Sequence, residues 1–336
     1  MTLPQTPFRK HAGLPHRLAQ GVSLVVLIAL LSPLVGAAAL FMPGPLAQDT
    51  TVVVAHGASS ADIGAQLVQG KAIYLSSLFR VGARIVASNS LKAGEYMIPA
   101  RASVMDIALM MHEGRSVSRL FKVPEGLTSA EIVRLLKSDP TLVGTIDAAP
   151  AEGSLLPESY RYSYGDDRAH MIARMQKAMQ DELNEIWAGR DDGLPLKSPA
   201  DAVTLASIVE KETGKAQERP RIAGVFYNRL RLNMRLQSDP TVIYALTNGQ
   251  ETLARTLTHD DLSFASPFNT YTSDGLPPQP ICNPGSAALK AVAHPEHNNY
   301  LYFVADGSGG HAFAADLAKH DENINHWHQI ENAGHK

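Results

Sequence analysis

The stretch Asp201–Gly214 reads DAVTLASIVEKETG and has the spacing of a helix with one apolar face. Pro199 and Asp201 are typical of a helix start, and Gly214 is a residue favoured just beyond a helix end. Glu212 follows Ile208 by four residues, so it lies on the apolar face. The other members of that face are Ala202, Leu205, Ala206 and Val209. The pattern therefore predicts a packed helix that holds one carboxyl among apolar neighbours.

Such a position gives Glu212 the properties of an acid catalyst. A carboxylate with apolar neighbours loses solvation, so its pKa rises and it can stay protonated near neutral pH as a general acid. The alternative is an ion pair, because Arg219, Arg221 and Arg229 follow closely in the sequence. Glu210 falls at the margin of the same face and is the competing candidate for the acid.

Near the N-terminus, residues Gly21–Met42 form an apolar run without a charge. About 20 such residues can span the hydrocarbon core of a membrane. Basic residues precede the run, so the positive-inside rule predicts a cytoplasmic tail over residues 1–20 and an exported body. The alternative is a signal peptide that is cleaved near residues 37–39 or at Ala47.

Two folded parts are expected after this span. Over residues 50–118, Thr51–Ala55 predicts a strand, two amphipathic helices follow, and Leu91–Ile98 predicts a turn and a second strand. This order is that of a small βααβ module, and a further helix follows it. The remainder, residues 119–336, mixes strands and helices, so the predicted fold class is α+β with a larger mixed α/β domain.

Within residues 119–336, a strand is expected at Arg119–Val123 and a helix at Ser129–Ser138, while residues 139–168 are rich in turn formers. A long helix should follow. Its apolar stripe favours a core face over an adaptable binding face. The stripe consists of Met171, Met175, Met179, Leu183 and Ile186.

Charge and cysteine content exclude several classes of protein. The chain carries 30 Lys and Arg residues and 33 Asp and Glu residues, and three of the basic ones precede the first acid, Asp49. An acidic body without a basic stripe argues against nucleic acid as a partner. Cys282 is the only cysteine, which excludes an intrachain disulfide and Cys-x-x-Cys metal or redox chemistry.

Several long motifs resemble those of one enzyme family, the endolytic murein transglycosylases, also called MltG or YceG-like. The resemblance covers essentially everything after the cytoplasmic tail. The EGSLLPESY segment departs from the family pattern, because Ser154, Leu155 and Leu156 stand where the family usually has an aromatic pair, which weakens any role in sugar stacking. The segments that carry the resemblance are LKAGEY (91–96), VPEGLT (123–128), EGSLLPESY (152–160), ASIVEKET (206–213), the run from Glu218 to Leu246, the run from Ser266 to Pro295 and the run from Tyr300 to His320.

The resemblance implies an enzyme that cleaves the β-1,4 bond between N-acetylmuramic acid and N-acetylglucosamine inside peptidoglycan strands and leaves 1,6-anhydromuramyl ends. It further implies an inner-membrane protein with a periplasmic catalytic domain, a LysM-like identity for the βααβ module, peptidoglycan synthases as partners, and no cofactor. In this family type a glutamate precedes a hydroxyl residue, which favours Glu212, before Thr213, over Glu210. The resemblance implies that this single glutamate protonates the departing oxygen and, once ionised, takes the proton of the muramyl C6 hydroxyl, which is the internal nucleophile. The alternatives are a non-catalytic glycan-binding scaffold and a hydrolytic muramidase. A muramidase needs a second carboxylate across the groove, for which Asp239 and Glu210 are the candidates.

Other family-like segments supply candidate walls of a sugar groove. Gln237 and Asp239 lie in RLQSDPT, where Asp239 can alternatively cap a helix that starts with Pro240. Asn269 and Tyr271 lie in a loop and suit acetamido and hydroxyl groups, or loop-stabilising hydrogen bonds. Asn283 is interpreted first as a turn residue.

The thirteen histidines raise the question of a metal site. His311, His320, His326 and His328 lie near the C-terminus, but the last two are two residues apart, which does not suit a helical zinc site. We therefore expect surface or tail histidines and no metal.

Overall fold

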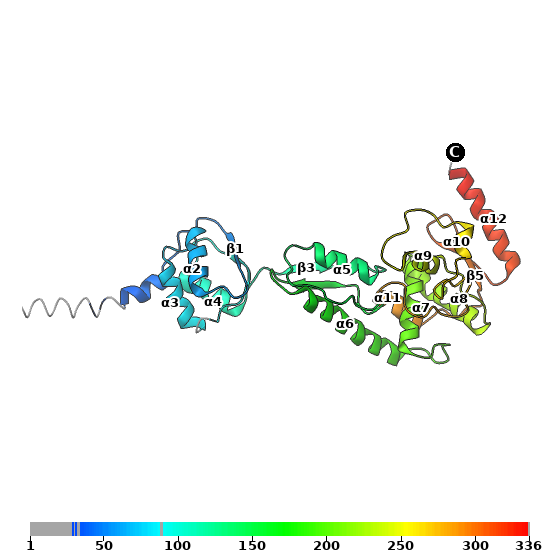
Figure 1. Ribbon diagram of the computed structural model, residues 1–336, viewed down its shortest axis with the longest axis horizontal. Helices are drawn as coiled ribbons and strands as arrows, with labels where there is room; N and C mark the ends of the chain where they lie inside the picture. The colour runs from blue at the N-terminus through cyan, green and yellow to red at the C-terminus, as the bar shows by residue number, and fades with distance from the viewer. Residues whose placement is uncertain (1–28, 30, 32–33, 88–89, 335–336) are drawn as a thin grey trace, which may run out of the picture. The chain divides into compact units, whose positions relative to one another are not determined.

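The protein is described by a computed structural model over residues 29, 31, 34–87 and 90–334. The chain forms two compact units, residues 1–117 and 118–336. Each unit has a hydrophobic core of its own. The secondary structure combines helices with two-stranded antiparallel sheets, so the predicted α+β class is confirmed (Figure 1).

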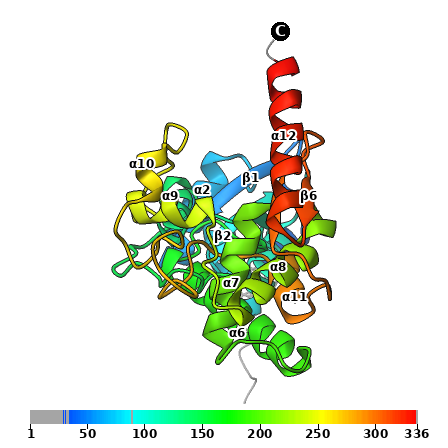
Figure 2. The same cartoon turned by 90° about the vertical axis from the view of Figure 1, so that its right-hand side faces the viewer.

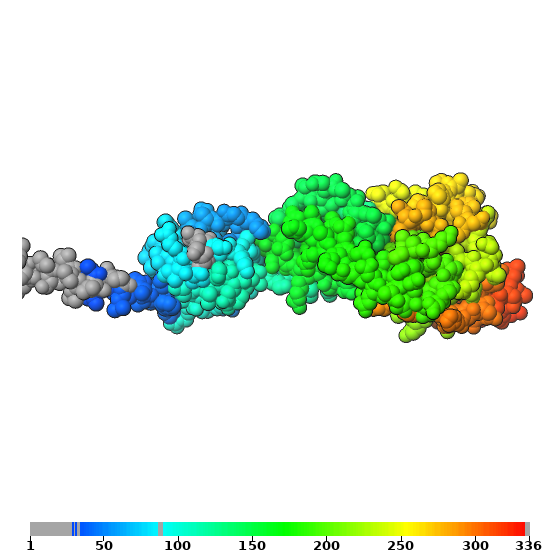
Figure 3. Space-filling model, turned by 90° about the horizontal axis from the view of Figure 1, so that it is seen from below, coloured from blue at the N-terminus to red at the C-terminus, as the bar shows by residue number. Residues whose placement is uncertain are grey.

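The first unit follows the expected order of strand, helix, helix and strand, and it is the blue-to-cyan body in Figure 3. Its strands pair antiparallel, with Val52 opposite Tyr96. Ser59 caps the first helix in a reciprocal capping box with Asp62. The elements are β1 (Thr50–Val54), α2 (Ser60–Gln69), α3 (Ser76–Ala87), β2 (Gly94–Ile98) and α4 (Val104–Glu113).

The chain before β1 is helical over residues 34–41. Leu40 is 4% exposed and packs in the core of the first unit, whereas Leu34, Val35 and Phe41 are exposed. The predicted span falls largely outside the described residues, which omit 21–28, 30, 32 and 33. In the part of the chain that the structure describes, no helix is both long and apolar enough to cross a membrane.

The second unit opens with a strand and helix at the expected places, but one strand was not expected. Residues 159–162 form a strand within the stretch whose proline and glycine content had indicated only turns, and it pairs antiparallel with the strand at 119–122. Tyr160 and Tyr162 fill its buried positions. The elements of this part are β3 (Arg119–Lys122), α5 (Ser129–Ser138), β4 (Ser159–Tyr162) and α6 (Arg168–Gly189).

The apolar stripe of α6 is buried throughout, so the prediction of a core face is confirmed. Its N-terminal half packs against the β3–β4 ribbon, and its C-terminal half joins the core around the central helices. The remaining elements are α7 (Pro199–Glu212), the 3₁₀ helix η1 (Ala216–Glu218), α8 (Arg219–Arg231), α9 (Asp239–Thr247), α10 (His259–Leu262), α11 (Ser286–Ala293), β5 (Tyr302–Ala305), β6 (His311–Ala314) and α12 (Leu317–Gly334).

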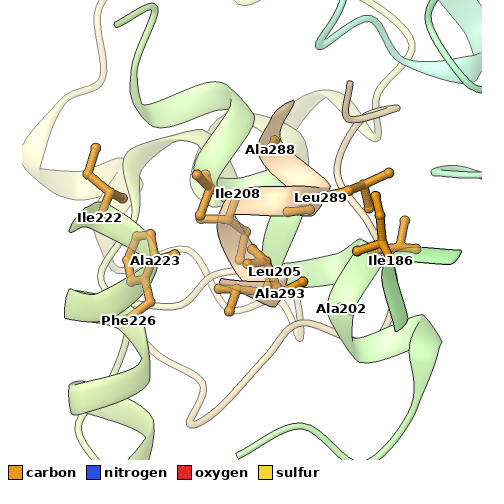
Figure 4. Packing of buried hydrophobic residues seen from close by; sticks show 14 of the residues in the cluster. Ile186, Ala202, Leu205, Ile208, Ile222, Ala223, Phe226, Ala288, Leu289 and Ala293 are labelled. Carbon is orange, nitrogen blue, oxygen red and sulfur yellow. The ribbon is translucent and has the colours of Figure 1, made fainter. Parts of the chain in front are cut away.

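Helix α7 lies at the centre of this core. Figure 4 shows Leu205 and Ile208 of α7 between Ile222 and Phe226 of α8 on one side and Leu289 of α11 on the other. All of these side chains are buried. A helix packed on more than one side is held firmly, so the residue at its end has a fixed position.

The β5–β6 hairpin lies against α8 and carries the last helix. Phe303 of β5 packs edge-on against Phe226 of α8. Helix α12 runs along the hairpin, as Figure 2 shows beside β6. His320 of α12 stacks on Tyr302 of β5. This packing brings the C-terminal segment of the chain to the end of α7.

Candidate active site

The sequence at both ends of α7 explains where the helix stops. The Ser198 hydroxyl accepts a hydrogen bond from the Asp201 N–H, and Pro199 occupies the first turn, as the sequence predicted. The helix ends at Glu212, because Thr213 has extended backbone angles. Gly214 follows the C-cap directly and so lies just beyond the helix end, as the sequence predicted. Glu212 is the last helical residue, and its side chain leaves the core.

Glu212 faces a cavity of about 330 Å³ that is built from α7, α8, the start of α9, the loop at Tyr271, the β5–β6 hairpin and α12. Glu212 is half-buried, and part of its surface is open to this cavity. The polar side chains that line the cavity are those of Glu212, Arg229, Gln237, Asp239, Tyr271, His311 and His320.

The environment makes Glu212 a weak acid. Burial is the main cause that raises its pKa from the usual 4.5 to about 7, and the charge of Asp239 raises it further. A hydrogen bond from Ser238 and the charge of Arg229 oppose this rise. A carboxyl with this pKa holds a proton for much of the time near neutral pH, as a general acid requires.

The alternative of an ion pair for Glu212 is wrong, because all three arginines have other partners. Arg221 pairs with Glu296 at 2.9 Å. Arg229 donates through Nε to the Leu301 carbonyl at 2.6 Å and through Nη1 to the Leu236 carbonyl at 2.8 Å.

Arg219 pairs with the competing candidate acid, Glu210, at 3.0 Å. The side chain of Glu210 is 5% exposed, and its second oxygen accepts the Gly285 N–H at 3.0 Å. Both oxygens of Glu210 are therefore engaged in contacts with other residues. Glu210 does not line the Glu212 cavity, and it connects α7 to the start of α8 and the start of α11.

Ser238 is the nearest partner of Glu212 and was not singled out from the sequence. Its hydroxyl donates a short hydrogen bond to Glu212 Oε1. Ser238 is also the N-cap residue of α9, but its side chain makes no capping hydrogen bond. The Ser238 hydroxyl, which at an N-cap would usually accept a backbone N–H of the helix, therefore donates to Glu212 instead. The one sequence signal was a serine directly before Asp-Pro, which is equally typical of an ordinary cap.

Two predicted groove residues meet in the cavity. The Tyr271 hydroxyl donates to Asp239 Oδ1 at 2.6 Å. Burial and this bond raise the pKa of Tyr271, so the phenol stays a donor. Asp239 is the first residue of α9 rather than its cap, so the capping alternative is wrong.

Gln237 also lines the cavity, and its backbone has a left-handed φ of 51°. That conformation is uncommon for a residue other than glycine. The Gln237 N–H donates to the Thr270 carbonyl at 3.1 Å, and its Oε1 accepts from Arg229 at 3.3 Å. These bonds hold the turn between α8 and α9 that presents Ser238 to Glu212.

Asn269 does not line the Glu212 cavity. It is fully buried, its Nδ2 donates to the carbonyls of Leu262 and Phe264, and its Oδ1 accepts the Tyr271 N–H at 2.9 Å. It therefore stabilises the loop, which was the alternative to a sugar contact, and it supports Tyr271 from behind.

Asn283 is likewise buried. It accepts the Leu155 N–H at 2.9 Å and donates to Glu152 at 3.1 Å, so it connects two family-like segments. Its interpretation as a structural residue agrees with these contacts.

The prediction of surface or tail histidines is correct for His326 and His328, which are exposed on α12, and wrong for two others. His311 and His320 line the Glu212 cavity. The buried Nδ1 of His320 has no hydrogen-bond partner among the described residues, and burial lowers the pKa of this imidazole. No periodic pattern in the sequence could indicate that a hairpin and the last helix fold back onto α7.

Comparison with known proteins identifies the family to which these motifs belong. Residues 52–326 match the sequence pattern of the YceG-like family. The chain belongs to this family. A crystal structure of a yceG-like protein from Listeria monocytogenes is 32% identical in sequence, with a TM-score of 0.50, and the match covers 82% of this chain and 98% of that one. The family resemblance seen in the sequence is therefore confirmed.

Two curated relatives in the family carry the name endolytic murein transglycosylase. The protein of Bacillus subtilis (strain 168) is 34% identical over 173 residues, which are 52% of this chain and 47% of the relative. The protein of Streptococcus pneumoniae serotype 2 (strain D39) is 27% identical over 319 residues, covering 82% of this chain and 57% of the relative. The chain thus spans about half the length of the curated relatives it matches.

Proposed function

We propose that the protein is an endolytic lytic transglycosylase that cleaves the bond between N-acetylmuramic acid and N-acetylglucosamine within peptidoglycan strands. The observation that carries this proposal is Glu212, a carboxyl with a pKa near 7 that faces a cavity and has no ion-pair partner among the residues that the structure describes. It occurs in a chain of the YceG-like family, whose curated relatives are named for this activity.

In the proposed reaction, protonated Glu212 transfers its proton to the glycosidic oxygen that leaves the muramyl C1. The muramyl C6 hydroxyl attacks C1 and forms the 1,6-anhydro ring, so the substrate supplies the nucleophile that glycosidases usually take from a second carboxylate or from water. Gln237, Asp239 and Tyr271 are proposed to contact the sugars, because they line the same cavity as the acid.

A hydrolytic muramidase is the second candidate, because Asp239 places another carboxyl in the cavity. Its Oδ1 is engaged by the Tyr271 hydroxyl, which leaves the other oxygen available to activate water. The products distinguish the two reactions: hydrolysis leaves reducing muramyl ends, and transglycosylation leaves anhydro ends.

The proposed location is the inner membrane, with residues 1–20 in the cytoplasm, a single span at residues 21–42, and the catalytic unit in the periplasm. The charge-free apolar run and its basic flank support this topology. We further propose that the βααβ unit is LysM-like and binds glycan, and that the enzyme limits the length of nascent strands beside peptidoglycan synthases.

The test is digestion of purified, uncrosslinked glycan strands by the full chain in detergent, with product ends identified by mass spectrometry. We expect 1,6-anhydromuramyl ends with the unaltered enzyme, and a rate lowered by at least about 10²-fold in Glu212→Gln, since the loss of a general acid has this effect or more. Glu210→Gln is the matched comparison and should retain measurable cleavage. Reducing ends would favour the muramidase, and cleavage that persists in Glu212→Gln would refute the proposed acid.

A further inference from the structure

A histidine and a glutamate form a second polar pair at the Glu212 cavity. His311 is the first residue of β6, and its side chain lines the cavity. Its Nδ1 lies 2.7 Å from Glu218 Oε2, and its backbone N–H donates to Glu218 Oε1 at 3.0 Å. The two side chains are only 16% and 14% exposed. Glu218 therefore holds both the backbone and the ring of His311.

Glu218 is itself tied to the end of the catalytic helix. The Thr213 hydroxyl donates to Glu218 Oε2 at 3.1 Å, and Thr213 directly follows Glu212. Hydrogen bonds from His311 and Thr213 hold the pKa of Glu218 below its usual range despite partial burial, so this carboxyl is ionised at neutral pH. The His311–Glu218 pair is thus bonded to Thr213, the residue that directly follows the acid Glu212.

The pairing determines which ring nitrogen of His311 is free. An ionised carboxylate accepts the proton of Nδ1–H, so the neutral imidazole keeps its lone pair on Nε2. Phe303 and Phe313 pack against the ring edge-on and fix its plane. A carboxylate that orients a histidine in this way is the arrangement by which enzymes prepare a general base.

In the proposed reaction the C6 hydroxyl must give its proton to a group in the cavity. Glu212 holds its proton when the substrate binds, so it cannot accept another proton from the C6 hydroxyl until it has given up the first. A neutral imidazole in the same cavity can accept that proton while the C6 oxygen attacks. Separate acid and base groups remove the need for one carboxyl to serve two oxygens in turn.

We propose that His311 is a second catalytic residue, the base that accepts the proton of the muramyl C6 hydroxyl, and that Glu218 is its positioning residue. This inference rests on the proposed function. Glu212 first gives its proton to O4 as the C1–O4 bond breaks. The C6 oxygen then bonds to C1 from the same face of the ring while the C6–O–H proton moves to His311 Nε2. The products are the anhydro end, a free O4 hydroxyl, a Glu212 carboxylate and a His311 imidazolium, which exchange one proton through solvent to restore the enzyme.

The pH dependence of His311 also depends on the charged groups around it. The groups that face it or share its cavity come from every neighbouring element. They are Glu218 of η1 and Lys215 before it, Asp306 after β5, Arg221 and Arg229 of α8, His320 of α12, and Glu212 and Asp239 at the ends of α7 and α9.

The test compares the pH profiles of kcat/KM for the full chain in detergent on peptide-free glycan strands. With two groups at work, activity falls on the alkaline side as Glu212 loses its proton and on the acid side as His311 gains one. We expect His311→Gln to lower kcat by about 10²–10⁴-fold, the usual contribution of a general base, and to lose the acid limb. Glu218→Gln should lower kcat less and move the acid limb to lower pH, because a neutral amide stabilises the imidazolium less than a carboxylate does.

Free imidazole provides a readout that a structural role would not affect. His311→Ala leaves space beside Phe303 and Phe313, so added imidazole should restore part of the rate in proportion to its concentration. The matched control is His294→Ala, because His294 Nδ1 also lies 2.7 Å from a carboxylate, that of Asp191, outside the Glu212 cavity. This control should keep the unaltered rate and should not respond to imidazole.

The outcomes separate this inference from the proposed function. If Glu212→Gln is inactive while His311→Gln and Glu218→Gln keep the rate and the acid limb, the function stands and the base is wrong. A loss of rate in His311→Ala without imidazole rescue, together with an unchanged profile in Glu218→Gln, also overturns the inference. If Glu212→Gln is fully active, the proposed function fails first.

Discussion

At the scale of single residues, Glu212 is governed by two opposing effects. Burial raises the pKa of its carboxyl, and the Ser238 hydroxyl lowers it by donating to the charged form. The resulting value of about 7 lies where a general acid works best at neutral pH, because the group still carries its proton and gives it up readily.

Replacing Ser238 should change the pH profile more than the product. Ser238→Ala removes the donor that stabilises the carboxylate, so the pKa of Glu212 rises further and the alkaline limb of kcat/KM moves up by about one pH unit. The maximum rate should fall several-fold because the carboxyl loses its fixed orientation. A profile unchanged from that of the unaltered enzyme would contradict this role. Ser263→Ala, on an exposed turn, is the control.

The same carboxyl should make folding stability depend on pH. A carboxyl whose pKa rises from 4.5 to about 7 on folding favours the folded state less as pH rises. The stabilising contribution of protonated Glu212 is therefore fully present below pH 4.5 and is lost as the pH rises through 7. The loss is at most about 3 kcal/mol. We expect Glu212→Gln to raise the melting temperature at pH 8 and to leave it unchanged at pH 4.

Glu210→Gln gives a contrast of opposite sign in the same melting experiment. Glu210 is ion-paired with Arg219 and accepts a backbone N–H, so loss of its charge leaves the buried Arg219 with only the longer contact to Glu125 at 3.5 Å. We expect a lower melting temperature at pH 8. Stabilisation by both substitutions would show that general charge reduction, rather than the burial of Glu212, is the cause.

At the scale of elements, the site depends on how closely α8 meets the chain that follows α11. A Cβ atom on Gly224 of α8 would lie 2.4 Å from the Glu296 carbonyl oxygen and 2.6 Å from the Asn298 amide. The backbone approach at this point allows only glycine. It lets Asn228 of the same helix donate to the Tyr300 carbonyl at 3.0 Å, just before the β5–β6 hairpin.

Gly224→Ala should therefore destabilise the second unit by about 1–3 kcal/mol, the usual range for overpacking a core. The measurement is the denaturant midpoint, accompanied by the rate of strand cleavage, which should fall because the hairpin carries His311. Gly189→Ala is the matched control: Gly189 ends helix α6, and a Cβ there would meet nothing within 4 Å. Equal denaturant midpoints for Gly224→Ala and Gly189→Ala would contradict the close approach of α8 to Glu296 and Asn298.

At the scale of the whole molecule, the two units are held by separate cores. The core of the first unit runs from Leu40 to Met111, and the two cores of the second contain only residues from Phe121 onward. The residues that line the Glu212 cavity all belong to the second unit.

We therefore expect a fragment of residues 118–336 to fold alone and to cleave soluble glycan strands. Its thermal unfolding should show one transition, because each small domain unfolds cooperatively. Cleavage should be abolished by Glu212→Gln in the same fragment, which serves as the control. A fragment that unfolds at room temperature, beside an active full chain, would show that the first unit is needed for the stability of the second.

The residue pattern alone determined a large part of this description. Helical spacing placed Glu212 on the packed face of α7 and the methionine stripe of α6 in the core, because both depend on a local period of 3.6 residues. The order of strands and helices in the first unit was equally visible. The apolar run of residues 21–42 remains a prediction from the sequence.

Only the tertiary structure decided which side chains surround Glu212. Ser238, His311 and His320 come from segments 26, 99 and 108 positions further along the chain, and no local pattern connects them to α7. It also showed that Glu210 and the three arginines are engaged elsewhere, which the sequence had left open. The physical reason is that burial and hydrogen bonding are set by long-range packing, and these two effects, not helix phase, fix the pKa of a carboxyl.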